Sequence, residues 1–158
     1  MKKGLLVPFD GSQNAVEALH LAVTLAKALG EKLIVLNVQP SFHTIHTKLF
    51  FQESDLREYQ QKLFHEMMET AEPMLKSSGV NYEQKLRIGD PRQQIIAEAK
   101  DAKIRMIVMG SRGMNPIVGG VLGSVSYGII NAAVCPTTIV PLSPLEVEVA
   151  EQANASAK

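Results

Sequence analysis

The chain has 158 residues, which fits one domain, because single domains commonly hold about 100–150 residues. Its 16 basic and 16 acidic side chains cancel, so the strongly positive surface of proteins that bind nucleic acid or anionic membranes is not expected. With 46% hydrophobic and 20% charged residues, the composition is that of a globular protein and excludes a largely disordered chain.

The first part of the chain predicts a strand, a helix and a second strand. Residues 4–9 form a short apolar run without alternation, as expected for a strand that is covered on both faces. Ser12 is a suitable helix N-cap, and small or apolar residues then recur at helical spacing until Gly30, a suitable C-cap. Residues 32–38 form a second buried strand.

The middle of the chain predicts a loop, a long helix and a polar strand. Residues 41–52 lack clear periodicity, whereas apolar residues recur at helical spacing from Leu56 to Met74. Pro73 removes a helical hydrogen bond, so we expect the regular helix to kink or end there. The strand over residues 80–88 has little apolar content, which favours an edge position.

The last part predicts two further helices and two further strands. Asp90 and Pro91 are suited to the cap and the first position of a helix, and residues 104–109 form a buried strand. A glycine-rich stretch over residues 110–124 leads into a helix over residues 125–133, followed by a strand over residues 137–142. We therefore expect one domain over residues 1–142, and a loosely ordered tail over residues 143–158.

Strands that alternate with helices predict an α/β fold, a doubly wound parallel sheet with helices on both faces. In such sheets ligands bind beyond the carboxyl ends of the strands, where the winding direction reverses. Two strand ends carry suitable residues: Asp10 with its neighbours Gly11 and Ser12, and the glycine-rich stretch that begins at Gly110.

The glycine-rich stretch is suited to holding phosphate. Five of the chain's 11 glycines lie between Gly110 and Gly123, and glycine lets backbone N–H groups approach a ligand closely. The following helix would offer free N–H groups and the positive end of its dipole, and Ser124 could add a hydroxyl. Taken alone, the stretch is equally consistent with a flexible connection.

Several segments together resemble the universal stress protein family, in its ATP-binding branch. The spacing of Gly110, Gly113, Gly123 and Ser124 matches the nucleotide-binding signature of that branch. The further matching segments are VPFDGS at 7–12, LNVQP at 36–40, GDP at 89–91, VMGSRG at 108–113 and CPTTIVP at 135–141, so that the resemblance spans residues 3–141.

The resemblance implies a Rossmann-like five-stranded sheet of order 3-2-1-4-5, similar to that of the adenine-nucleotide α-hydrolases, with the first and fourth strands adjacent. It implies that Val38 contacts adenine through backbone groups, that Asp10 lies near ribose and phosphates, and that Met109 and Gly110 line the ribose. The full set of nucleotide-binding residues it implies is Pro8, Asp10, Val38, Met109, Gly110, Arg112, Gly113, Gly123, Ser124 and Val125. Asp10 is open to a second interpretation, as a turn former and helix cap.

The expected function is that of an ATP-binding stress or regulatory protein in which nucleotide occupancy acts as a switch. The resemblance also implies a homodimer formed through the fifth strand, with a further protein partner that the sequence does not identify. Arg112 is the only cation in the glycine-rich stretch, so ADP or AMP could compete with ATP, and Mg²⁺ would be held through the phosphates.

Two other functions remain open. One is a slow metal-dependent ATPase or phosphotransferase, although the usual catalytic motifs are absent and we assign no catalytic residue and no metal ligand. The other is an interaction module that binds no nucleotide.

The remaining reactive side chains have structural interpretations. His43 and His46 make a poor zinc site without Cys or acidic companions, and with Lys48 they fit a surface loop or lid. His20 and His65 fit helix surfaces, and Cys135 fits a small apolar position. No signal peptide and no membrane span are expected, and with a single cysteine the protein is expected to be cytoplasmic.

Overall fold

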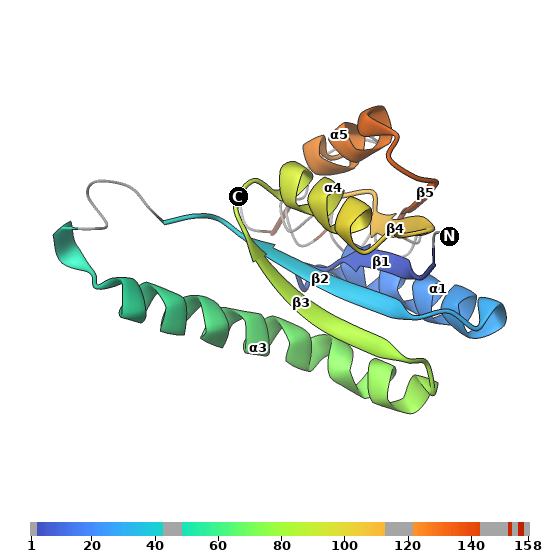
Figure 1. The fold of residues 1–158 in the computed structure, drawn as a ribbon, viewed down its shortest axis with the longest axis horizontal. Coiled ribbons are helices and arrows are strands. Elements are labelled where there is room, and N and C mark those ends of the chain that lie inside the picture. Colours follow the sequence, from blue (N-terminus) through green and yellow to red (C-terminus); the bar gives the residue numbers. More distant parts are fainter. Residues whose placement is uncertain (1–2, 43–48, 113–121, 143–151, 153–154, 157–158) are drawn as a thin grey trace.

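The computed structural model describes residues 3–42, 49–112, 122–142, 152 and 155–156. Five parallel strands form one sheet of order β3-β2-β1-β4-β5 (Figure 1). The strands are β1 (Leu5–Pro8), β2 (Leu33–Gln39), β3 (Tyr82–Ile88), β4 (Met106–Gly110) and β5 (Thr137–Val140). The α/β fold, the strand order and the edge position of the polar strand β3 are therefore confirmed.

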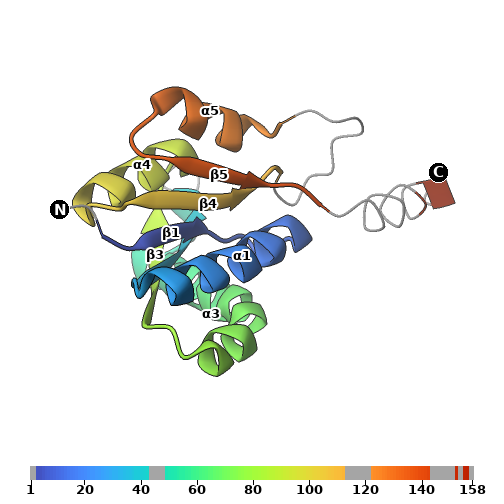
Figure 2. The same cartoon turned by 90° about the vertical axis from the view of Figure 1, so that its right-hand side faces the viewer.

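Helices cover both faces of the sheet. The four long helices among the described residues are α1 (Gln13–Leu29), α3 (Glu53–Ser78), α4 (Pro91–Asp101) and α5 (Ser124–Ala132). Helices α1 and α3 pack on one face, and α4 and α5 pack on the other (Figures 1 and 2). The strand residues alternate between the two resulting cores: Leu5 and Val7 face α1 and α3, whereas Leu6 faces α4 and α5.

Local signals set the ends of most helices. The Ser12 hydroxyl accepts a hydrogen bond from the Ala15 amide (3.2 Å) at the start of α1, and Gly30 ends that helix at a φ of 64°. Asp90 accepts from the Gln93 amide (3.1 Å) at the start of α4, where Pro91 takes the first position. These predicted caps are confirmed.

Of the two outcomes expected at Pro73, a kink or an end of the regular helix, the end is wrong. The helix runs without interruption from Glu53 to Ser78, although Pro73 lies inside it. Pro73 is exposed, while Ala71 and Leu75 on either side of it are buried against the sheet, so packing on this face offsets the lost hydrogen bond. The predicted loop over residues 41–52 also differs, because Leu49 and Phe50 are helical.

Two sequence-based expectations fall largely outside the described residues. The tail expected over residues 143–158 is described only at Gln152, Ala155 and Ser156, and the glycine-rich stretch is described only at its two ends.

Candidate functional site

A cavity of about 330 Å³ opens beyond the carboxyl ends of β1 and β4, the two strands at which the winding direction reverses. Side chains from the ends of three strands and the first turns of α4 and α5 surround it. Nine residues expected to bind nucleotide line this cavity: Pro8, Asp10, Val38, Met109, Gly110, Arg112, Gly123, Ser124 and Val125. The tenth, Gly113, lies outside the described residues.

Pro8 explains why the sheet opens at this point. The pairing of β1 with β4 covers only Leu5 and Leu6, and the next residue of β1 facing β4 is Pro8, which has no N–H to donate. On the other side, the Phe9 amide donates to the Leu36 carbonyl (2.8 Å) as β1 ends. The pairing of β1 with β4 therefore ends at the edge of the cavity.

Asp10 lines the cavity and also forms the turn expected of it. Its Oδ1 accepts a hydrogen bond from the Ser12 amide (3.0 Å), which shapes the turn between β1 and α1. The cap of α1 itself is Ser12 rather than Asp10. Asp10 is half-buried at the cavity, and its second carboxylate oxygen has no hydrogen-bond partner among the described residues.

The start of α5 forms the polar end of the cavity. Its N-cap, Gly123, has no side chain to cap the helix, and the first amide bonded back to it is that of Tyr127 (2.9 Å). The amides of Ser124 and Val125 therefore have no carbonyl partner within the helix. Together with the helix dipole and the nearby Arg112, they make this end suitable for an anion.

Part of the cavity lining is apolar, and most of these residues were missed by sequence reasoning. Leu36, Pro91 and Ile95 line it beside the expected Val38. Pro91, the last residue of the GDP segment, and Ile95 lie one helical turn apart at the start of α4, and this spacing was the available signal. An apolar slot with exposed strand-end backbone suits a flat heterocyclic ring.

Two polar links behind the cavity were also missed. The Ser126 hydroxyl donates to the Gly110 carbonyl (2.9 Å), and the buried Asn14 amide donates to the Ser111 hydroxyl (2.9 Å). A Cβ atom at Gly110 would lie 2.7 Å from the Asn14 Cβ, so a glycine is needed where α1 crosses the end of β4. Sequence spacing does not reveal these contacts between distant segments.

The other reactive side chains lie away from the cavity. His20 and His65 are exposed on α1 and α3, and Cys135 packs against the core beneath α4 and α5. His43, His46 and Lys48 lie outside the described residues. Within the described part of the chain, no three His, Cys, Asp or Glu side chains are grouped so that they could hold a metal ion, and no helix is long and apolar enough to cross a membrane.

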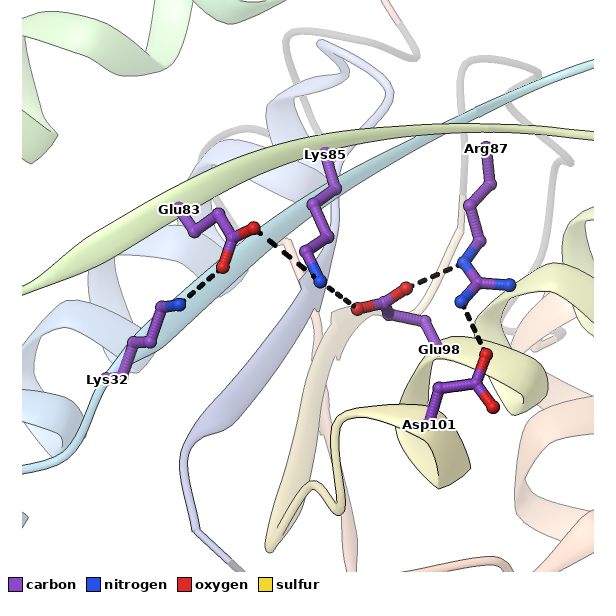
Figure 3. Close-up of polar contacts among 6 residues, drawn as sticks. All are labelled: Lys32, Glu83, Lys85, Arg87, Glu98 and Asp101. Atoms are coloured by element: carbon purple, nitrogen blue, oxygen red, sulfur yellow. Dashed lines mark hydrogen bonds and ion pairs between the residues drawn. The ribbon is translucent and has the colours of Figure 1, made fainter.

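The clearest pKa shifts also lie elsewhere, in a row of charged residues between β3 and α4 (Figure 3). Glu98 is buried and accepts hydrogen bonds from Lys85 (2.8 Å) and Arg87 (2.6 Å). The bond to Glu98 raises the pKa of Lys85, and the bond from Lys32 to Glu83 lowers the pKa of Glu83. The bond from Arg87 to Asp101 (2.7 Å) completes the row, which stabilises the fold away from the cavity.

Comparisons with known proteins agree with this architecture. Residues 1–141 match the model of the universal stress protein family. Universal stress protein YxiE of Bacillus subtilis is 31% identical over 143 residues, covering 86% of this chain and 97% of the relative. The solved universal stress protein UspA of Lactobacillus plantarum has a TM-score of 0.75 at 25% identity and covers 87% of this chain and 97% of that one.

Two more distant solved structures share the fold and contain nucleotides. A universal stress protein in complex with cAMP has a TM-score of 0.67 at 23% identity and covers 90% of this chain and 98% of that one. A universal stress protein family protein of Arabidopsis thaliana with AMP bound has a TM-score of 0.65 at 20% identity, with 91% and 94% coverage.

Proposed function

This chain belongs to the universal stress protein family, and we propose that it binds an adenine nucleotide in the cavity at the carboxyl ends of β1 and β4. The observation that carries the proposal is that one cavity combines two kinds of lining. Apolar residues, namely Leu36, Val38, Pro91 and Ile95, and a helix start suited to anions both line it, as an adenine base joined to phosphate requires.

The described cavity residues can be assigned to the base, the ribose and the phosphate of the nucleotide. Val38 would offer backbone groups to the base, and Met109 with Gly110 would lie along the ribose. Ser124 and Val125 would hold phosphate through their backbone N–H groups and the Ser124 hydroxyl. Gly123 would let phosphate approach the helix start closely, since its own amide donates to the Ser111 carbonyl (2.9 Å). Three further residues complete the proposed site, namely Pro8, Asp10 and Arg112, and Gly113 is proposed on the sequence alone.

The nucleotide proposed first is ATP, with ADP and AMP as competitors. The AMP and cAMP complexes of the two distant relatives support adenine nucleotides as a class. Asp10 and Arg112 are the charged side chains among the described residues that line the cavity, so backbone dipoles and a metal ion would meet much of a triphosphate's charge.

Mg²⁺ fits this donor set only as a companion of the nucleotide. Asp10 supplies the one carboxylate among the described cavity residues, and Mg²⁺ is usually held by one or two carboxylates together with phosphates and water. When bound, the ion would neutralise phosphate charge, while Asp10 would orient it from the turn that Ser12 holds.

We place the protein among regulators rather than enzymes. A hydrolase must position or deprotonate water, and one Asp10 oxygen is already used in its turn. Nucleotide occupancy would then act as a switch that another protein reads. A slow ATPase remains the second candidate because Asp10 and the positive end of α5 line the same cavity.

Two measurements test whether the protein binds an adenine nucleotide, and which one. The purified protein is denatured and the supernatant is analysed by mass spectrometry, followed by calorimetric titration with AMP, ADP and ATP, with and without Mg²⁺. Arg112→Glu should raise the Kd at least tenfold at low ionic strength, whereas Arg57→Glu, on an exposed part of α3, should leave it unchanged.

The absence of both co-purified nucleotide and binding heat would overturn the proposal. Phosphate release from ATP that survives purification and disappears in Asp10→Asn would instead favour the ATPase. Equal rates in both proteins would identify a contaminant and leave the regulatory function preferred.

A further inference from the structure

On the α3 face of the sheet lies a buried chain of amide side chains, formed by Asn37 and Gln39 of β2 on either side of the cavity residue Val38. Asn37 is 2% exposed and Gln39 is 5% exposed. The Asn37 Nδ2 donates to the Phe9 carbonyl (2.9 Å), and the Gln39 Nε2 donates to the Asn37 Oδ1 (3.1 Å). The Gln39 Nε2 also donates to the main-chain carbonyl of Gln60 in α3 (3.0 Å).

The contact with Phe9 lies where the pairing of β1 and β2 ends. Along this pair, the β1 amides of Leu5 and Phe9 donate to β2 carbonyls, and the alternation of a parallel ladder makes the Val38 amide the next donor to the Phe9 carbonyl. That main-chain bond is not formed within the described part of the chain. The Asn37 side chain takes its place on the carbonyl.

We propose that Asn37 is a positioning residue for base recognition, because it occupies the Phe9 carbonyl and so leaves the Val38 amide facing the cavity as a donor to the ligand's ring. The inference rests on the proposed nucleotide site. Without the Asn37 side chain, the Val38 amide could close onto the Phe9 carbonyl and extend the ladder by one bond. A donor needed by the base would then be lost to the sheet.

Gln39 holds Asn37 in the orientation that this role requires. Both acceptors around the Gln39 Nε2 are oxygens, so the amide group of Gln39 can only be placed with its nitrogen toward them. Its bond to the Asn37 Oδ1 directs the Asn37 nitrogen to Phe9. The Gln39 Oε1 is buried without a hydrogen-bond partner among the described residues, which costs free energy. The protein tolerates this cost in the orientation of Gln39 that lets its Nε2 hold Asn37.

Amide hydrogen exchange in the ligand-free protein tests the inference without depending on binding. In the wild type, the Val38 amide should exchange much faster than the amides of Leu36 and its strand neighbours, since it has no acceptor among the described residues. In Asn37→Ala, the Val38 amide should become protected. A Val38 amide that is already protected in the wild type would overturn the inference even if nucleotide binds.

Base selectivity provides the functional readout. The probes are AMP and IMP, which differ at the ring edge, or ATP and ITP if the wild type prefers triphosphates. We expect Asn37→Ala to raise the Kd for AMP about tenfold or more. The ratio of the Kd for IMP to the Kd for AMP should fall toward one. A parallel loss for both nucleotides would show a structural role only and would contradict the inference.

Two further variants separate a loss of base selectivity from a loss of stability. Ser78→Ala removes a buried hydroxyl at the far end of α3, which bonds to the Leu75 carbonyl (2.7 Å), and should lower stability without changing the ratio of the two Kd values. If Asn37→Ala does not fold, Gln39→Ala removes the group that orients Asn37 and should also reduce the ratio. An unchanged ratio in that variant would contradict the inference. Failure of the wild type to bind any adenine nucleotide would instead refute the proposed function.

Discussion

Gly110 is the residue at which the end of β4, the first turn of α1 and the cavity come together. A Cβ atom there would lie 2.7 Å from the Asn14 Cβ and 3.0 Å from two Asn14 backbone atoms. Because backbone cannot move aside as a flexible side chain can, we expect Gly110→Ala to lower the free energy of unfolding by about 1–3 kcal/mol. Urea denaturation measures this loss.

Gly128 in α5 is the matched control for that substitution. A Cβ atom there would meet Arg92, 2.4 Å from its Cδ, but this side chain is 55% exposed and can rotate into solvent. Gly128→Ala should therefore be neutral or raise stability by up to about 1 kcal/mol, since alanine favours the helix. Equal losses in the two variants would show that close packing at Asn14 is not the reason for a glycine at position 110.

At this scale, sequence reasoning located residues better than it located their contacts. Pro8, Asp10 and Gly123 were expected from short segments, and all three line the cavity. Asn37 and Asn14 were missed, because each acts through a hydrogen bond to a residue far away in the sequence. Such a bond depends on how two elements pack, which the local pattern does not contain.

Among the elements, β3 and α4 are joined by polar contacts centred on Glu98. Its side chain is only 3% exposed, whereas Lys85 and Arg87 remain 32% and 25% exposed (Figure 3). Glu98→Gln leaves both cations without their shared counter-ion. Removing one partner of a fully buried pair costs about 3–5 kcal/mol. We expect a smaller loss of about 2–3 kcal/mol in urea denaturation, because water still reaches both cations.

The control for Glu98→Gln is the same substitution in an exposed pair. Glu72 lies 3.1 Å from Lys76 one turn along α3, and both side chains are well exposed. Glu72→Gln should change stability by less than about 0.5 kcal/mol. A comparable effect of the two variants would mean that burial of Glu98 adds nothing.

The same row of charges predicts a pH dependence. The hydrogen bond from Lys32, and next the charge of Lys85, lower the pKa of Glu83, so its contribution to stability is present above the ordinary glutamate pKa of about 4.3 and is lost as the pH falls below it. Lys85 has a raised pKa, so its contribution is lost only under strongly alkaline conditions. Between pH 6 and pH 3, the free energy of unfolding should fall less steeply in Glu83→Gln than in the wild type. Identical slopes would show that the lowered pKa of Glu83 does not contribute to the pH dependence.

The elements themselves were largely predictable, with one instructive error. Caps at Ser12, Gly30 and Asp90 are local signals, and the structure has them where the sequence places them. Pro73 also gave a local signal, but the buried neighbours Ala71 and Leu75 keep α3 helical through it. Strand order came from the family resemblance, since apolar runs do not indicate which strands pair.

On the scale of the whole molecule, the two edges of the sheet differ in character. Edge strand β3 carries Glu83, Lys85 and Arg87, and charged side chains on an edge oppose pairing with another sheet. Edge strand β5, Thr137–Val140, has no charged residue. Helix α5 lies beside β5 (Figure 2), and its Tyr127 and Ile130 are 62% and 43% exposed, which adds exposed apolar surface on this element.

This asymmetry predicts self-association through β5 rather than β3. We expect the wild type to have the mass of a dimer in light scattering at micromolar concentration, and Thr137→Lys to shift it to a monomer, since a charge would then lie on the pairing edge. Asn81→Lys adds the same charge beside β3 and should leave the dimer intact. A monomeric wild type, or dimers that survive Thr137→Lys but dissociate in Asn81→Lys, would show that the unpaired edge of β5 is not where two copies meet.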